Sequence, residues 1–266
     1  MITINCSLSA AQHLYKGFKK GSCEGFFEPV TTQSLADTQA EQEKKKKACF
    51  QWVVHAIKLG RSTCLIAMEY ETRYCHVIHQ VKKGDMQDFV SRLQERLMNG
   101  LEWQGQDYSL FNSVEMEQGI ERYFSLHKDV RFYQRTDRSV MSHISQVDGE
   151  YSEVYHHNTG YFPPDEKTAL DFDFKLNQTW RNRKGDKFEL YANEKMIQQW
   201  LTQYLCFAPQ KVIDAMARMK AVKQELWDIR LAAMAEVYQP FDDATIIETN
   251  GGNNVIDFKR YQRSKK

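Results

Sequence analysis

Residues 50–81 read FQWVVHAIKLGRSTCLIAMEYETRYCHVIHQV, and this stretch decides the fold class. It contains three runs rich in β-branched and aromatic residues, at 50–59, 62–70 and 73–81. Gly60-Arg61 separates the first two runs, and Glu71-Thr72 joins the second to the third. Because connections this short join antiparallel neighbours, the stretch predicts an antiparallel β-meander.

Helical and extended patterns surround the meander. Apolar spacing and capping residues predict helices at 7–18, 85–99, 113–126, 140–154, 193–204 and 209–238. In this reading Gly84-Asp85 begins the second of these helices and Asn99-Gly100 ends it, while Asn193 caps the fifth. Further strands are expected at 1–6, 130–134, 169–176 and 188–191. The fold class is therefore α+β, with helices covering an antiparallel sheet.

The chain is expected to divide into three parts. An α+β domain spans about 1–205 and carries a polar insert at 31–47, followed by a long amphipathic helix at 206–238 and a flexible linker with a basic tail at 239–266. The long helix has apolar residues spaced alternately by three and four, the pattern of a narrow coiled-coil seam. Its central residues are Met219, Val222, Leu226 and Ile229.

Composition excludes several classes of protein. Lysine and arginine number 36 against 35 acids, so the net charge of +1 supplies no general attraction to nucleic acid or anionic membranes. The six cysteines form no C-x-x-C pair, which argues against a zinc ribbon and a disulfide framework. There is no signal-peptide pattern, and no apolar run approaches the roughly 18 residues of a membrane helix. We expect a reduced, cytoplasmic protein without a cofactor.

Several short segments carry a family resemblance, among them residues 1–6, Thr72-Arg73 and the pair of Asn177 with 188–191. Trp52-Val-Val-His55 and the strand-to-helix signature Thr136-Asp-Arg-Ser139 resemble a bacterial family grouped only as a domain of unknown function, over about residues 1–205. Asp137 and Ser142 depart from the asparagine and glycine usual in that family. The resemblance implies the fold and a setting among chromosomal islands, plasmids and phage-related genomes. It implies no catalytic residue, because the family has no settled activity.

The signature is also a candidate binding site. A helix N-terminus has free N–H groups and a partial positive charge, so a helix that begins here could hold an anion with Arg138. Alternatively, Thr136 or Asp137 caps the helix and Arg138 pairs with an acid. The binding candidates are Thr136, Asp137, Arg138, Ser139, Thr72 and Arg73.

Other patterns suggest sites more weakly. Basic residues that could contact nucleic acid are Lys44, Lys45, Lys46, Lys47, Lys259, Arg260 and Arg263. Asp165, Asp173 and Lys175 resemble in spacing the acids and lysine of metal-dependent nucleases, although an alternating solvent face explains the same letters. Strand alternation puts Cys75 and His79 on one face and His76 on the other, so no metal site is predicted there. No serine or cysteine has the surroundings of a catalytic nucleophile.

Three functions remain open. The first is a non-enzymatic protein-interaction or accessory protein of a bacterial mobile-element or defence setting, which associates through 209–238 and the tail. The second is a nucleic-acid-binding or nucleic-acid-processing protein. The third is a phosphate or nucleotide binder at the helix start that carries Arg138.

Overall fold

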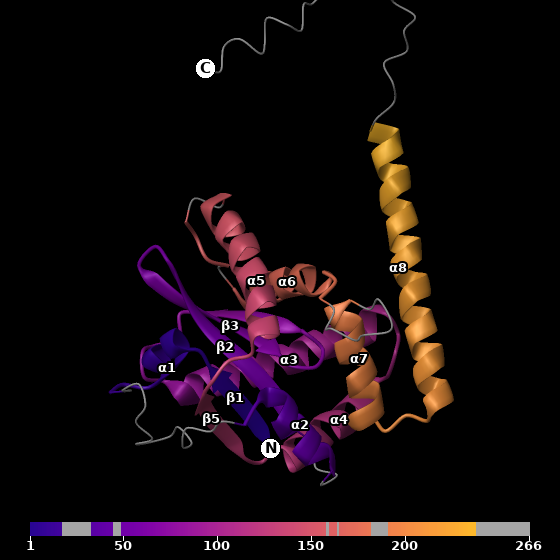
Figure 1. Cartoon of the computed structure of the whole chain (residues 1–266). Coiled ribbons are helices and arrows are strands. Elements are labelled where there is room, and N and C mark those ends of the chain that lie inside the picture. The colour runs from indigo at the N-terminus through magenta and orange to yellow at the C-terminus, as the bar shows by residue number, and fades with distance from the viewer. Residues whose placement is uncertain (18–32, 45–48, 158–159, 164, 182–190, 238–266) are drawn as a thin grey trace, which may run out of the picture. The chain divides into compact units, whose positions relative to one another are not determined.

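The computed structural model describes residues 1–17, 33–44, 49–157, 160–163, 165–181 and 191–237 (Figure 1). The predicted tail at 239–266 lies outside these residues, as does most of the strand predicted at 188–191. Two compact units are present, Met1–Val222 and Lys223–Lys266.

Five strands among the described residues form one sheet in the order β4-β3-β2-β1-β5. Their bounds are β1 Ile2–Cys6, β2 Phe50–Leu59, β3 Ser62–Glu69, β4 Cys75–His79 and β5 Val130–Gln134. The predicted meander is confirmed, because β2, β3 and β4 pair antiparallel. However, β1 runs parallel to both β2 and β5, so the sheet is mixed rather than purely antiparallel. The long helical connections between these parallel strands permit this arrangement, whereas tight turns would not.

Helices cover both faces of the sheet, and Figure 1 shows α5 in front of the strands and α3 behind them. One core cluster receives side chains from α1 (Leu8–Leu14), α3 (Met86–Asp107), α4 (Ser113–Leu126) and α7 (Ala192–Gln203). The other receives them from α2 (Leu35–Lys44), α5 (Arg138–His157) and α6 (Glu166–Asn177). Trp52 and Val54 point into the first cluster, whereas Val53 points into the second. This two-sided burial explains why the central strands are apolar along their whole length.

The strand predicted at 169–176 is wrong, because these residues belong to α6. Its buried positions recur at helical spacing and include Leu170, Asp173, Leu176 and Asn177. With Ala169 the buried residues number five and two of them are polar, so a search for apolar residues finds only part of the buried face. The alternation of Phe172 and Phe174 with charged residues then imitates a strand.

The helix predicted at 7–18 ends earlier, at Leu14, and the boundaries predicted at Asn99-Gly100 and at Asn193 are also wrong. Asn99-Gly100 lies inside α3, which continues to Asp107, and Gly100 serves close packing rather than termination. A Cβ at Gly100 would lie 3.0 Å from the hydroxyl oxygen of Tyr74. The N-cap of α7 is Tyr191, and Asn193 is a buried residue of the first turn. The latter two differences arise from tertiary packing, which local propensity does not contain.

Helix α6 covers the open edge of the sheet, where β4 has no further strand among the described residues. The Asn177 amide accepts a hydrogen bond from Cys75 N and donates one to Cys75 O, both at 2.7 Å. Asp173 Oδ1 accepts from Val77 N at 3.2 Å. These side chains replace the missing strand, because they satisfy backbone groups that would otherwise be buried without partners.

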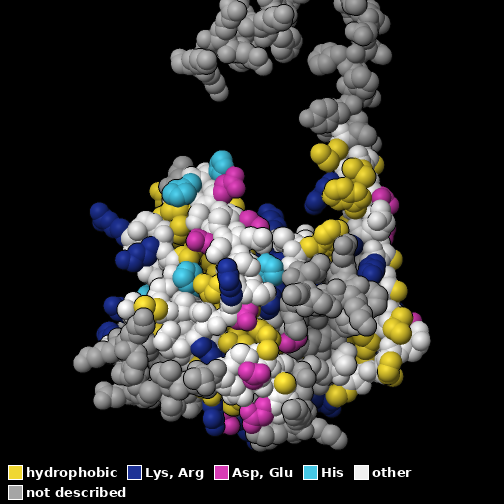
Figure 2. Space-filling model, in the orientation of Figure 1, with side chains coloured by type: hydrophobic (Ala, Val, Ile, Leu, Met, Phe, Trp, Pro, Cys, Tyr) yellow, Lys and Arg dark blue, Asp and Glu magenta, His cyan; other side chains and the backbone are white. Residues whose placement is uncertain are grey.

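Helix α8, Pro209–Val237, crosses the boundary between the two units. Within the first unit, Val212, Ala215 and Met219 join the first core cluster. Figure 2 shows hydrophobic side chains along this helix. In the residues of α8 beyond Val222, the exposed large hydrophobic side chains are Leu226, Trp227, Ile229, Leu231 and Met234.

Candidate functional site

The β3–β4 turn is built around one buried carboxylate. Glu69 Oε2 accepts hydrogen bonds from the backbone N–H groups of Glu71 and Thr72, at 2.9 and 2.6 Å. It also accepts one from Thr72 Oγ1 at 2.8 Å. Arg73 follows in the left-handed region at φ 64°, a conformation uncommon for residues other than glycine. The turn is therefore held in one specific shape, and this shape fixes the direction of Arg73.

Arg73 brings the two predicted binding segments together. Its side chain is buried, at 2% exposure, and its guanidinium lies 5.3 Å from the centre of the Tyr70 ring. It donates hydrogen bonds to Tyr70 O and, at 3.3 Å, to Ser139 Oγ. The Thr72-Arg73 turn and the start of α5 thus meet in space, although 66 positions separate Arg73 from Ser139.

The remaining signature residues have separate roles. Asp137 Oδ1 accepts a hydrogen bond from Val140 N at 3.0 Å, which is the contact of a helix cap. Thr136 and Arg138 are exposed, and no described carboxylate pairs with Arg138. The structure thus places Arg73, rather than Arg138, against the Ser139 hydroxyl at the start of α5.

His143 is a further polar residue near the start of α5. It lies one helical turn after Ser139 on α5, and its Nδ1 is buried without a hydrogen-bond partner among the described residues. Burial, and then the positive charges of Arg73, Arg181 and Lys195, lower the pKa of His143 to about 4. Three cations from three different parts of the chain therefore act on the His143 imidazole and help to keep it neutral. We call Arg73, His143, Arg181 and Lys195 the cationic cluster.

Arg181 is the most unusual member of the cluster. Its side chain is 1% exposed, and its Nη1 lies 3.6 Å from Cys75 Sγ. Its Nε and Nη2 are buried and have no partner among the described residues. Lys195 Nζ lies 3.4 Å from the Arg181 carbonyl oxygen, which brings α7 to the same place. A buried guanidinium without a carboxylate is costly, and no carboxylate of the described residues pairs with Arg181, so its free N–H groups suit an anion.

Acidic groups near the cluster do not neutralise Arg181. Burial raises the pKa of the Cys75 thiol to about 11, Arg181 opposes this rise, and Asp173 and Glu150 add to it. Asp173 is already engaged, since it accepts from His76 Nδ1 at 2.7 Å and from Arg96 at 2.8 Å. Glu150 forms no ion pair with Arg181 within the part of the chain that the structure describes.

The structure does not bring Asp165, Asp173 and Lys175 together as a nuclease site would require. Asp173 is fully buried in its network with His76 and Arg96. Asp165 caps α6 through Thr168 N at 2.7 Å, and Lys175 is exposed on the same helix. Among the described residues, no group of three or more His, Cys, Asp or Glu side chains is arranged to hold a metal ion.

A serine and a histidine also lie in contact, at Ser7 and His55. Ser7 Oγ and His55 Nδ1 are 2.9 Å apart. However, the same oxygen accepts from Ala10 N at 3.3 Å, so Ser7 acts as the N-cap of α1. Ser7 Oγ also lies 3.1 Å from Ser9 Oγ, so the Ser7 hydroxyl is occupied by contacts within the chain. The contact between Ser7 and His55 therefore has a structural role.

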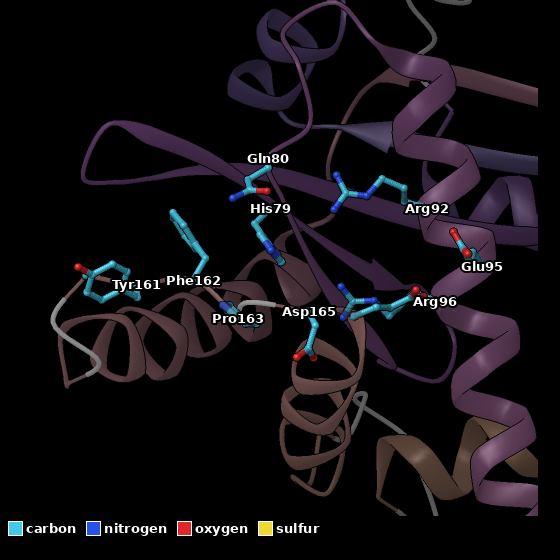
Figure 3. Close-up of a pocket in the computed structure, with 11 residues that line it drawn as sticks. His79, Gln80, Arg92, Glu95, Arg96, Tyr161, Phe162, Pro163 and Asp165 are labelled. Carbon is cyan, nitrogen blue, oxygen red and sulfur yellow. The ribbon is translucent and has the colours of Figure 1, made fainter.

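A concave site lies between α3 and α6, at the end of β4. This α3–α6 pocket has a volume of about 480 Å³. Figure 3 shows the side chains of Arg92 and Arg96 reaching from α3 on the same side of His79, with Asp165 at the start of α6. Phe162 stacks on the His79 ring with the two centres 5.5 Å apart. Sequence reasoning missed this site because its cations stand on a helix that reads as an ordinary amphipathic one.

The structure describes only some of the residues predicted to contact nucleic acid or another protein. Lys44 is the last residue of α2, whereas Lys45–Lys47, Lys259, Arg260 and Arg263 lie outside the described residues. Of the helix seam, Met219 is buried in the core and Val222 packs against it, whereas Leu226 and Ile229 are exposed. Among the described helices, none is both long and apolar enough to cross a membrane.

Comparison with known proteins gives a family but no function. A family model whose description is "Domain of unknown function (DUF6933)" matches residues 30–195. No curated protein matches the chain, and no solved structure does. The matched range contains the whole cationic cluster and the whole α3–α6 pocket, and it ends before α8.

Proposed function

This chain belongs to the DUF6933 family of domains of unknown function, and from that premise we propose that it binds a small phosphate-bearing ligand at the cationic cluster. A property common to a family should reside in the range that its members share. Arg73, His143, Arg181 and Lys195 all fall within residues 30–195. The site therefore suits a function of the family rather than one peculiar to this chain.

The observation that carries the proposal is the state of Arg181. Two of its nitrogens are buried without partners among the described residues, and guanidinium N–H groups are good donors to phosphate oxygens. Lys195 supplies a further charge, and Ser139 supplies a hydroxyl at the start of α5. A phosphate has enough acceptor oxygens to use several of these donors at once.

Calorimetry with inorganic phosphate and pyrophosphate tests the proposal. Lys195→Met should weaken binding about tenfold, which corresponds to about 1.4 kcal/mol for one lost charged contact. Lys167→Met removes the same charge from an exposed position of α6 outside the cluster, so it should leave the affinity unchanged. Wild-type protein that binds neither ion, or equal affinity in the two variants, would contradict the proposal.

A nuclear magnetic resonance titration of His143 gives a second readout. The pKa of this imidazole lies at about 4 because of burial and then the surrounding cations. A bound phosphate would offset those charges and raise the His143 pKa, since a nearby negative charge favours the imidazolium. Calorimetric binding without any change in this pKa would place the phosphate elsewhere on the protein.

Self-association through α8 is a second candidate function. The observation that favours it is the exposed apolar set Leu226, Trp227, Ile229, Leu231 and Met234. Leu226 and Ile229 continue the three-four spacing that two helices use to pack together, so the occupant we propose is α8 of a second copy. Sedimentation equilibrium should show a dimer that Leu226→Gln with Ile229→Gln converts to monomer. A wild-type monomer at high micromolar concentration would exclude this role.

A further inference from the structure

The α3–α6 pocket contains two arginines at one end. Arg92 and Arg96 stand one helical turn apart on α3 and both line the cavity (Figure 3). Arg96 is nearly buried and is held by Asp173 at 2.8 Å, which fixes its direction. Arg92 has only a 3.7 Å contact with Asp88 on the same exposed helix surface, a pair that contributes little. Arg92 is therefore free to turn to an anion in the cavity.

His79 presents a different kind of group to the same space. Its side chain is 7% exposed, and its Nδ1 is buried with no partner among the described residues. The Pro163 backbone acts on the ring and opposes the lowering of the His79 pKa by burial, so we assign the proton to the other ring nitrogen and a bare lone pair to Nδ1. Burial, and then the charges of Arg92 and Arg96, lower the pKa of His79 and keep the ring neutral. A group that satisfies Nδ1 must therefore be a donor, such as a hydroxyl.

Acidic residues line the rest of the pocket. Asp165 and Glu166, at the start of α6, hydrogen-bond Thr168 N at 2.7 Å and the Asn99 amide at 3.0 Å. Their carboxylates disfavour a ligand with negative charge along its whole length, and they accept hydrogen bonds from neutral hydroxyls. The pocket thus has donors at Arg92 and Arg96, with the Glu95 carboxylate on the same helix, and acceptors at His79 and at the start of α6.

We propose that the α3–α6 pocket binds a small hydroxylated anion, whose single phosphate or carboxylate contacts Arg92 and Arg96 and whose hydroxyl donates to His79 Nδ1. The cavity of about 480 Å³ lies within the size range of small-molecule sites. The His79 ring, stacked on Phe162, supplies a rigid wall for the carbon skeleton. This site is separate from the cationic cluster, with which it shares no residue.

The test compares matched ligands by calorimetry on the full chain. Glycerol 3-phosphate is paired with propyl phosphate, and lactate with propionate, so each pair differs in its hydroxyl groups. The phosphate and carboxylate arms decide which anion the arginines prefer. We expect the hydroxylated member of the preferred pair to bind at least about tenfold more tightly, because the analogue leaves a buried acceptor without a donor. Equal affinities within both pairs, or no binding of any of the four compounds, would overturn the proposal.

Variants of His79 and Arg92 test the two ends separately. His79→Asn keeps a neutral acceptor close to the position of Nδ1 and should keep the preference for the hydroxylated ligand. His79→Phe keeps the ring that stacks on Phe162 and should abolish that preference. Arg92→Met should weaken every bound anion about tenfold, whereas Arg61→Met, at an exposed turn, should not. Identical behaviour of the two His79 variants, or of the two arginine variants, would overturn the assignment.

Lys195→Met distinguishes this site from the cationic cluster. The variant should reduce the affinity for inorganic phosphate and leave the hydroxyl preference unchanged. If Lys195→Met and Arg92→Met weakened the same binding event equally, the separate site would be refuted. Thermal unfolding of each variant in the absence of ligand shows whether a loss of binding reflects a loss of folded protein.

Discussion

Replacing Asn177 by leucine should lower the free energy of unfolding by about 2–5 kcal/mol. The Asn177 amide satisfies both the N–H and the carbonyl group of Cys75, each at 2.7 Å, in a part of β4 that is fully buried. Leucine leaves both backbone groups without partners, and a buried orphan group costs about 1–3 kcal/mol. It also removes the 2.8 Å hydrogen bond from Asn177 Nδ2 to Asp173 O.

Equilibrium urea unfolding measures the effect, and Gln178→Leu is the matched control. That change also converts an amide to leucine, at the next residue, but the Gln178 side chain is exposed. It should alter the free energy of unfolding by less than about 0.5 kcal/mol. Amide hydrogen exchange at Cys75 should accelerate in the Asn177 variant alone. A loss of less than about 1 kcal/mol in Asn177→Leu would refute the view that α6 completes the edge of the sheet.

Two further predictions concern stability. Burial, and then the N-terminal charge, lower the pKa of His127 from 6.5 to about 4, so its stabilising contribution is present above pH 6.5 and is lost as the pH falls toward 4. The free energy of unfolding should fall by up to about 3 kcal/mol over that interval, and His127→Gln should flatten the fall in urea midpoints; parallel profiles would contradict this cause. Gly105→Ala should destabilise the protein in thermal unfolding, because its Cβ would lie 2.2 Å from the Phe111 ring. Gly149→Ala meets nothing within 4 Å on α5 and should instead stabilise it by about 0.5–1 kcal/mol; the reverse order would refute the packing described.

The local sequence pattern is sufficient to predict most helices and strands of this fold. The predicted bounds of β2 and α4 coincide with those observed, because the Gly60-Arg61 turn ends β2 and Asn112 caps α4. The parallel pairing of β1 with β2 and β5 could not be predicted, since nothing within a short strand specifies its distant partners. Helix α6 imitates a strand in sequence because Asp173 and Asn177 complete its buried face, and their partners on β4 are about a hundred positions away.

The candidate site is predictable only where its residues are neighbours in sequence. Thr72-Arg73 and Thr136–Ser139 stand out as two separate segments, and the hydrogen bond from Arg73 to Ser139 joins them. His143 could have been found as the residue one turn beyond Ser139 on the same helix. Arg181 and Lys195 carry no local signal, because an arginine after a helix and a lysine within one usually face solvent.

The central place of β1 in the sheet has a consequence for synthesis. Ile2 pairs with Phe50 on one side and with Val130 on the other, so the second edge of β1 stays open until the ribosome has made β5. During that interval the nascent chain exposes a strand edge that other polypeptides can join. Contacts this distant in sequence also slow folding, because a long loop must close before any pairing stabilises it. Chaperones that bind nascent chains would therefore protect this exposed strand edge until β5 emerges from the ribosome.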